Sequence, residues 1–288
     1  MIVKNAIIMA AGTSSRFVPL SVERPKGLLE VKGEILIERQ IRQLQEAGIN
    51  DITIVVGYKA EMFRYLIEKY GVDIVLNEDY QRYNNISSLV KVLDKLCNTY
   101  ICSSDNYFPR NIFLGTSVQS YYSALYSKGQ TNEYCIQYDG IDNITGVTVG
   151  GESSWYMTGP AFFAEEFSIK FKEIIIREYS KEETKLGYWE DLYIRFIDAV
   201  PAMKIKRYPP HEIEEFDSID DLRAFDQSYI DNTRSVIIKK IASLLECEES
   251  ELWNFSPVRH GGDAIIFTFN KAERKYHYNL AENCLTQL

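Results

Sequence analysis

A loop of small residues near the N-terminus and a lysine shortly after it could together hold a phosphorylated ligand. The loop reads Ala10-Ala11-Gly12-Thr13-Ser14-Ser15-Arg16 and follows a short apolar run. Small side chains let backbone N–H groups approach an anion closely, and Arg16 adds positive charge. Lys26 comes soon afterwards, in Arg24-Pro25-Lys26. The alternative is an ordinary strand-to-helix turn with a surface lysine, and the loop matches neither a Walker A motif nor G-x-G-x-x-G.

Two acidic segments could hold a divalent cation against such phosphates. Asp105 follows an apolar run and would lie at the carboxyl end of a strand, where open α/β sheets bind ligands. Glu215 and Asp217 are two residues apart, so in an extended chain both side chains project to one side. Carboxylate oxygens suit Mg²⁺. The alternatives are that Asp105 forms a turn and that Asp217 or Ser218 caps the following helix.

The elements that must position these residues alternate over the first hundred positions. Short β-branched runs predict buried strands, and apolar residues at helical spacing predict amphipathic helices. We expect strands at 6–9, 52–56, 72–76 and 99–102, and helices at 35–47, 62–70 and 87–96. This alternation predicts an α/β fold with a mixed, mostly parallel sheet flanked by helices.

The rest of the chain adds further strands and a small C-terminal part. We expect strands at 134–138, 144–149, 155–163 and 203–208, and helices at 164–179, 189–197 and 218–225. A helix at 236–245 and a hairpin of strands 264–269 and 274–278 follow. The predicted organisation is therefore a main domain over residues 1–227 and a small α+β appendage over residues 228–288.

Composition limits the class of protein. With 288 residues, 45% of them hydrophobic, the chain can bury a core, and its net charge of −9 argues against a nucleic-acid partner. No apolar run approaches the roughly 20 residues that span a bilayer, so no membrane insertion is expected. The five cysteines are irregularly spaced without C-x-x-C, which predicts a reduced, cytoplasmic protein.

Taken together, the glycine loop, Arg24-Pro25-Lys26 and Asp105 resemble the signature of nucleotidyltransferases that join an NTP to a phosphorylated small molecule. Five further segments are most similar to the bacterial CTP:phosphocholine cytidylyltransferase branch. In order, they are Tyr83-Asn84-Asn85 with Ser88-Leu89, Ser104-Asp105-Asn106-Tyr107, Thr131-Asn132-Glu133-Tyr134, Tyr188-Trp189-Glu190-Asp191 and Glu215-Phe216-Asp217-Ser218. The resemblance implies a Rossmann-like fold and a Mg²⁺-dependent transferase of the EC 2.7.7 class, which makes CDP-choline and pyrophosphate from CTP and phosphocholine.

The resemblance also implies roles for the matched residues. The triphosphate would be held by Ala10, Ala11, Gly12, Ser14, Ser15 and Arg16. Lys26 would neutralise charge near the α-phosphate, and Asp105 and Asp217 would bind Mg²⁺, with Glu215 as an outer or substrate-facing carboxylate. Asn85 and Ser88 would contact cytosine, and a helix N-cap at Asn85 or Ser87 is the alternative.

The choline end makes a separate chemical demand. A trimethylammonium group has no N–H donors, so aromatic faces and nearby carboxylates must hold it. The resemblance places Tyr134 and Trp189 there, beside acidic and aromatic neighbours that include Glu133, Glu190, Asp191, Tyr107 and Tyr188. For any single aromatic residue, burial in the core is the alternative.

Other acceptors remain open. Tyr134 stands where comparable enzymes often have tryptophan, so phosphoethanolamine and 2-aminoethylphosphonate are alternatives to phosphocholine. A sugar 1-phosphate acceptor would need hydrogen-bonding groups in place of aromatics. A nucleotide-binding protein without turnover is the further alternative, although it would not need Lys26, Asp105 and Asp217 together.

The C-terminal segment resembles the beginning of a choline-kinase-like domain. The resemblance rests on residues 238–245, on Glu251-Leu252-Trp253 and on Ser256-Pro257-Val258-Arg259-His260-Gly261-Gly262, followed by the hairpin. The sequence ends at Leu288 before a catalytic H-x-D motif, so kinase activity is not expected. We expect the segment to pack on the cytidylyltransferase or to form a homodimer contact.

Overall fold

The computed structural model describes residues 1–258 and 265–288. The chain divides into two compact units, each built from two stretches of sequence. Unit 1 comprises Met1–Gly12 and Ile37–Glu214, and unit 2 comprises Thr13–Leu36 and Glu215–Leu288. The segment that contains Arg16 and Lys26 thus groups with the C-terminal part of the chain.

Unit 1 is built on a nine-stranded mixed sheet with the order β10-β9-β11-β6-β1-β4-β5, in which β8 pairs with β11 and β12 pairs with β8. Strands β6, β1, β4 and β5 are parallel neighbours, whereas β11 runs antiparallel to β6. The nine strands of this sheet are β1 (Asn5–Ala10), β4 (Ile52–Val56), β5 (Asp73–Leu76), β6 (Thr99–Ser103), β8 (Tyr121–Tyr126), β9 (Gln130–Tyr138), β10 (Ile144–Glu152), β11 (Trp155–Phe163) and β12 (Lys204–Arg207). The short strands β7 (Asn106–Tyr107) and β13 (Glu214–Glu215) lie outside it, and β13 falls at the unit boundary. The helices are α2 (Leu36–Glu46), α3 (Tyr65–Tyr70), α4 (Asn85–Val90), α5 (Glu165–Glu178), α6 (Glu182–Leu186) and α7 (Trp189–Arg195).

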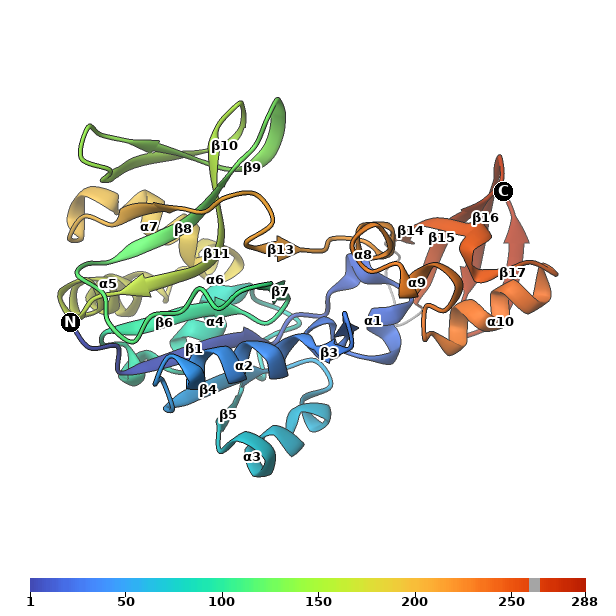
Figure 1. The fold of residues 1–288 in the computed structure, drawn as a ribbon, viewed down its shortest axis with the longest axis horizontal. Helices are drawn as coiled ribbons and strands as arrows, with labels where there is room; N and C mark the ends of the chain where they lie inside the picture. The colour runs from blue at the N-terminus through green and yellow to red at the C-terminus, as the bar shows by residue number, and fades with distance from the viewer. Residues whose placement is uncertain (259–264) are drawn as a thin grey trace. The chain divides into compact units, whose positions relative to one another are not determined.

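This architecture confirms the predicted α/β fold with a mixed, mostly parallel sheet flanked by helices. In Figure 1, α2 crosses in front of β1 and β4, while α4, α5 and α6 lie behind the strands. Strand β4 has the predicted bounds and is buried along its whole length, as expected of a strand covered on both faces. Among the residues described, no helix has both the length and the apolar character needed to cross a bilayer.

Some elements differ from the predictions. The helix expected at 87–96 is the shorter α4, which is followed by a 3₁₀ turn at Leu93–Lys95. Strand β8 was not predicted, because it has neither the β-branched run that marks a buried strand nor the alternation of apolar and polar residues that marks a half-exposed strand. The helix expected at 62–70 divides into a 3₁₀ turn at Ala60–Phe63 and α3.

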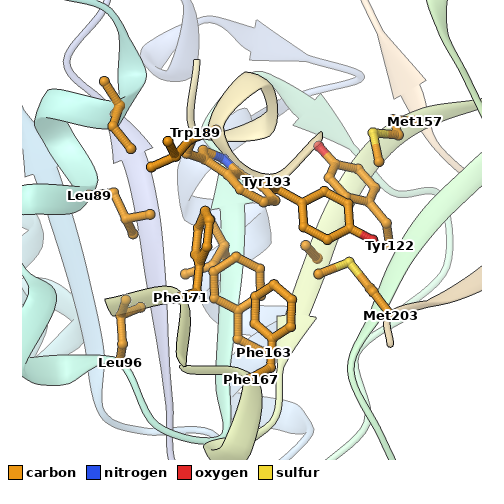
Figure 2. Close-up of a cluster of buried hydrophobic side chains, with 14 of the residues drawn as sticks. Leu89, Leu96, Tyr122, Met157, Phe163, Phe167, Phe171, Trp189, Tyr193 and Met203 are labelled. Carbon is orange, nitrogen blue, oxygen red and sulfur yellow. The ribbon is translucent and has the colours of Figure 1, made fainter. Parts of the chain in front are cut away.

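An aromatic core fixes α5 and α7 against the sheet. Figure 2 shows Phe163 of β11, Phe167 and Phe171 of α5, and Trp189 and Tyr193 of α7 gathered in one cluster. The ring centroid of Phe163 lies 4.7 Å from the ring centroid of Phe167 and 5.1 Å from that of Trp189. Burial of each such side chain contributes about 1.5–3 kcal/mol, so the start of α7 is held firmly in place.

Unit 2 contains a four-stranded antiparallel sheet in the order β14-β15-β16-β17. Its other elements are the 3₁₀ helices η1 (Ser15–Phe17), η2 (Lys26–Leu28) and η6 (Glu249–Glu251), α1 (Leu20–Glu23), the short strands β2 (Glu30–Val31) and β3 (Glu34–Ile35), α8 (Ile219–Phe225), α9 (Ser228–Asp231) and α10 (Val236–Leu244). The sheet strands are β14 (Leu252–Val258), β15 (Ile266–Lys271), β16 (Arg274–Asn279) and β17 (Cys284–Gln287). The predicted helix at 236–245 and the hairpin are present, whereas β14 and β17 were not predicted and Ala264 lies outside the described residues.

Gly57, directly after β4, lies against the loop that follows β1. The N–H of Tyr58 donates to the Ala11 carbonyl oxygen at 3.1 Å. A Cβ at position 57 would lie 2.8 Å from that oxygen and 2.7 Å from Cβ of Tyr80. Both distances are shorter than normal van der Waals contacts, so only glycine allows β4 to support the loop this closely.

We expect Gly57→Ala to displace Ala11 and to lower the free energy of unfolding by about 1–3 kcal/mol, the usual cost of overpacking. Gly140→Ala is the matched control, since a Cβ there would meet no atom within 4 Å. The control should change stability by less than about 0.5 kcal/mol. Urea denaturation measures both values, and equal stability of the two variants would contradict the close approach.

Candidate functional site

The loops that follow β1 and β6 leave the sheet side by side. The parallel register pairs Met9 with Ser103, and the N–H of Ser104 donates to the Met9 carbonyl oxygen at 3.1 Å. Residues 10–12 therefore begin next to Asp105. This is the carboxyl edge of the sheet, where open α/β folds bind ligands. Two of the predicted site segments are thus brought together within unit 1.

The two loops differ in what they present at this edge. Ala10 and Ala11 are buried, whereas a Cβ at Gly12 would meet no atom within 4 Å, so the backbone is open there. The Ser103 hydroxyl donates to Asp105 Oδ1 at 2.7 Å and orients that carboxylate. The edge thus offers an open stretch of backbone beside an oriented carboxylate.

Unit 2 carries the predicted cationic residues. Arg16 Nη2 lies 3.0 Å from Asp217 Oδ1, and both side chains are largely exposed. Lys26 is buried, and its Nζ lies 5.5 Å from the ring centroid of Phe17, which fixes the direction of the ammonium group. Ser14 adopts a left-handed conformation, with φ of 50°, at the start of η1.

The acidic segment after β13 keeps both of its candidate carboxylates on one side. Glu215 and Asp217 are exposed while Phe216 between them is buried, as the two-residue spacing predicted. Ser218, not Asp217, caps α8: its hydroxyl accepts from the N–H of Asp221 at 3.1 Å, and Asp221 Oδ2 accepts from the N–H of Ser218 at 2.9 Å. Asp217 therefore does not cap this helix.

The donor chemistry of these residues fits a hard divalent cation. Asp105 and Asp217 offer carboxylate oxygens, the ligands that Mg²⁺ prefers. The ion pair of Asp217 with Arg16 is exposed and thus weak, so this carboxylate can exchange its partner. Asp105 and Asp217 belong to different units, and within the described part of the chain no three His, Cys, Asp or Glu side chains gather as a metal site. Magnesium binding stays a prediction.

The segment predicted to contact the base is organised around Asn77, directly after β5. The Asn77 side-chain amide donates to the hydroxyls of Ser87 at 2.9 Å and Ser88 at 3.1 Å. Asn84 caps α4, and its Oδ1 accepts a hydrogen bond from the N–H of Asn85 at 2.9 Å. The alternative that Asn85 or Ser87 is the N-cap was therefore wrong, because the cap is the residue before Asn85. Asn77 was not predicted as a site residue, although its place at the end of a parallel strand was a usable signal.

Asn85 joins α4 to the first turn of α7. Its Nδ2 donates to Glu190 Oε2 at 3.1 Å, and its Oδ1 accepts from the backbone N–H of Trp189 at 2.7 Å. Asn85, which is predicted to bind CTP, is thus bonded directly to Glu190, which is predicted to bind the acceptor. The contact of Asn85 with cytosine stays a prediction.

Glu190 is a carboxylate held in place from two elements. Besides the bond from Asn85, its Oε1 accepts from the Tyr122 hydroxyl of β8 at 3.1 Å. Burial raises the pKa of Glu190 to about 7, although the hydrogen bonds from Asn85 and Tyr122 favour the charged form. Its charge therefore changes near neutral pH. Tyr122 lies on the strand that was not predicted, so its role was missed.

Asp191 is fixed by the two tyrosines predicted to bind the acceptor. The Tyr134 hydroxyl donates to Asp191 Oδ1 at 2.9 Å, and the N–H of Tyr188 donates to Oδ2 at 2.8 Å. Burial and the bond to Asp191 raise the pKa of Tyr134, so its phenol stays protonated. Tyr134 from β9 and Tyr188 from the start of α7 are thus brought to the same carboxylate.

Three other acceptor candidates have different surroundings. Trp189 is 1% exposed and stacks on Tyr122, with ring centroids 5.6 Å apart, inside the core drawn in Figure 2. Tyr107 is buried with the Arg39 guanidinium 4.8 Å from its ring centroid. Glu133 is exposed and precedes Tyr134 on β9, so the two side chains point to opposite faces. Trp189 is therefore buried in the core, which was the alternative given for any single aromatic residue.

We expect Glu190→Gln to change how stability depends on pH. The carboxyl titrates near about 4.3 when unfolded and at about 7 when folded, so the wild type loses stability as pH rises between these values. Glutamine cannot ionise, so the free energy of unfolding of the variant should rise by about 2–3 kcal/mol relative to that of the wild type between about pH 5 and about pH 8, as measured by urea denaturation at both pH values. Glu166→Gln, at an exposed site, is the control, and parallel pH profiles of wild type and Glu190→Gln would contradict the titration of Glu190.

The chain is similar to known nucleotide transferases. Residues 6–114 match the family model of the MobA-like NTP transferase domain. The choline-phosphate cytidylyltransferase of Streptococcus pneumoniae is 35% identical over 223 residues, which cover 77% of this chain and 97% of the relative. The 2-aminoethylphosphonate cytidylyltransferase of Lancefieldella rimae is 33% identical over 80% of this chain and 95% of the relative.

Solved structures extend the comparison. A structure of CTP:phosphocholine cytidylyltransferase from Streptococcus pneumoniae matches with a TM-score of 0.76 at 35% identity, covering 79% of this chain and 99% of that one. The inositol-1-phosphate CTP transferase from T. maritima, at 16% identity and a TM-score of 0.60, shares the fold. The kinase-like resemblance stays a prediction, and its residues Arg259, His260, Gly261 and Gly262 lie outside the described residues. By its identity with relatives that it covers almost completely, this chain belongs to the nucleotidyltransferase family and, within it, to the cytidylyltransferases.

Proposed function

We propose that this enzyme transfers the cytidylyl group of CTP to phosphocholine, which gives CDP-choline and pyrophosphate. The observation that carries the proposal is the group of Tyr134, Tyr188, Glu190 and Asp191, assembled from β9 and α7. Aromatic rings beside carboxylates are what a quaternary ammonium requires, because it cannot donate hydrogen bonds. The 35% identity with a choline-phosphate cytidylyltransferase over almost its whole length supports the same acceptor.

The proposed reaction needs positioning and charge neutralisation from the protein. A phosphate oxygen of phosphocholine attacks the α-phosphorus of CTP, and the bond from that phosphorus to the bridging oxygen breaks as pyrophosphate leaves. Arg16 and the backbone around residues 10–15 would hold the triphosphate. Lys26 would neutralise the charge that develops near the α-phosphate. The reaction requires no covalent bond to the enzyme, so orientation of the two substrates is the main task.

Asp105 and Asp217 are the residues that would hold Mg²⁺. Bound Mg²⁺ supplies charge neutralisation on the phosphates and raises the reactivity of the α-phosphorus. Asp217 is exposed and pairs with Arg16, so its carboxylate would hold Mg²⁺ while Arg16 would hold a phosphate group. Glu215, exposed on the same side of the chain as Asp217, would act as an outer carboxylate.

A second acceptor, 2-aminoethylphosphonate, is supported by two observations. A cytidylyltransferase for this compound is 33% identical over 95% of its length. The acceptor group here contains tyrosine at position 134, whose cation–π attraction is weaker than that of tryptophan. A primary ammonium could also donate hydrogen bonds to Glu190 or Asp191, which a quaternary ammonium cannot.

Pyrophosphate release with Mg²⁺ tests the proposal directly. CTP, UTP, ATP and GTP are each combined with phosphocholine, phosphoethanolamine, 2-aminoethylphosphonate and glucose 1-phosphate, and we expect turnover with CTP and phosphocholine. Asp105→Ala should lower turnover by about a thousandfold, since metal-stabilised charge contributes several kcal/mol. Preference for a primary ammonium acceptor would overturn the choline assignment alone, and no turnover with any pair would indicate a nucleotide-binding protein.

Substitutions at Tyr134 test the aromatic contact with the headgroup. We expect Tyr134→Leu to raise KM for phosphocholine by about 10-fold, because the cation–π contact is lost. Tyr134→Phe retains the ring and should stay within about 3-fold of wild type. KM for CTP should be the same in all three proteins. An equal KM for phosphocholine in the leucine and phenylalanine variants would show that the ring does not contact the cation.

A further inference from the structure

The C-terminal part of unit 2 contacts the segment that carries Lys26 on both sides of that lysine. On its N-terminal side, Glu23 accepts three hydrogen bonds from the start of α10. Its Oε1 accepts from the Ser235 hydroxyl at 2.8 Å and from the N–H of Ile237 at 2.8 Å, and Oε2 accepts from the N–H of Val236 at 3.2 Å. A carboxylate at a helix N-terminus also interacts favourably with the helix dipole. Glu23 therefore fixes the end of α1 to α10.

On the other side of Lys26, the β2–β3 hairpin is held by a second set of contacts. The Tyr229 hydroxyl donates to the Glu30 carbonyl oxygen at 2.7 Å, and Arg234 Nη1 donates to the same oxygen at 2.9 Å. The N–H of Lys32 donates to Asp226 Oδ2 at 2.7 Å. Burial alone would raise the pKa of Asp226, but hydrogen bonds from Lys32 and Ser228 outweigh it and lower the pKa, which keeps the carboxylate charged.

Four of these six hydrogen bonds are partly buried, whereas the bonds from Arg234 and from the N–H of Val236 are exposed, so the partly buried ones constrain the segment most. Tyr229 is 1% exposed, and Ser235 and Asp226 are also buried. A buried hydrogen bond is costly to lose, because each group left without a partner keeps its desolvation penalty. Residues 24–29 lie between the two anchored points, and Lys26 is within them.

The contacting residues come almost entirely from the part of the chain beyond the sequence resemblance. The matched segments end at about residue 227, and the two relatives are covered over 95% and 97% of their length by only 80% and 77% of this chain. Roughly a fifth of this chain therefore has no counterpart in them. Tyr229, Arg234 and Ser235 lie beyond the segments that carry the resemblance, so the resemblance itself assigns no role to their contacts with the Lys26 segment.

We infer that residues 226–237, here named the C-terminal clamp, position the Lys26 segment for cytidylyl transfer. Glu23 and Tyr229 are positioning residues in this account, since they act through Lys26 and not on the substrate. The inference rests on the proposed function for its kinetic consequence. The order that the clamp imposes on residues 24–32 can be measured without any turnover.

Tyr229→Phe and Glu23→Gln test the clamp in the full chain. Both should accelerate backbone hydrogen exchange in residues 24–32 by about 10-fold, since local opening becomes easier. Both should lower kcat by about 10-fold and change KM for the acceptor less than about 2-fold, because misplacement of Lys26 affects the transition state. Tyr278→Phe is the matched control: it removes a buried tyrosine hydroxyl bonded to Asn283, away from the Lys26 segment.

The outcomes separate the clamp from the proposed function. Faster exchange and lower kcat in Tyr229→Phe but not in Tyr278→Phe would support the clamp. Unchanged exchange in Tyr229→Phe, or equal loss of kcat in Tyr229→Phe and Tyr278→Phe, would overturn it. If the wild type shows no turnover with any substrate pair, the proposed function fails, and hydrogen exchange still decides whether the clamp orders residues 24–32.

Discussion

The parallel register between β1 and β6 is the constraint on which the candidate site of unit 1 depends. Because Met9 lies opposite Ser103, the small-residue loop and Asp105 leave the sheet at the same level. A shift of one residue would turn every side chain of β6 to the other face and separate the two loops. On the side of the other neighbour, β4, the N–H of Tyr58 donates to the Ala11 carbonyl, and Gly57 permits an approach that no other residue allows. The edge is thus defined by backbone geometry from both sides.

A second constraint acts on the acceptor group, where hydrogen bonds within the protein orient the carboxylates. Asp191 accepts from Tyr134 and Tyr188, and Glu190 accepts from Asn85 and Tyr122. Groups that are already ordered lose little conformational entropy when a ligand binds. The aromatic core beneath α7, which includes Trp189, supports this order by fixing the first turn of the helix.

The sequence predicted the local elements well and the long-range relations less well. Strand β4 could be predicted from its run of β-branched residues, and helix α2 from apolar residues at helical spacing. Trp189 was expected at the ligand, but adjacent residues on α7 face different sides, and the tryptophan lies in the core while Glu190 meets Asn85. The role of Tyr122 depends on pairing between β8 and β11, which no local pattern reveals. The grouping of residues 13–36 with the C-terminal part likewise depends on contacts between distant residues.

The discontinuity of unit 2 has a consequence for how the protein is made. Residues 13–36 leave the ribosome early, but the partners of Glu23, Glu30 and Lys32 lie about 200 positions later in the sequence. Chains fold as their segments emerge, and contacts of such high sequence separation form late. The sheet of unit 1 can therefore assemble around β1, β4 and β6 while the segment with Arg16 and Lys26 is still without its partners. The cationic part of the candidate site is then the last to reach its native structure during synthesis.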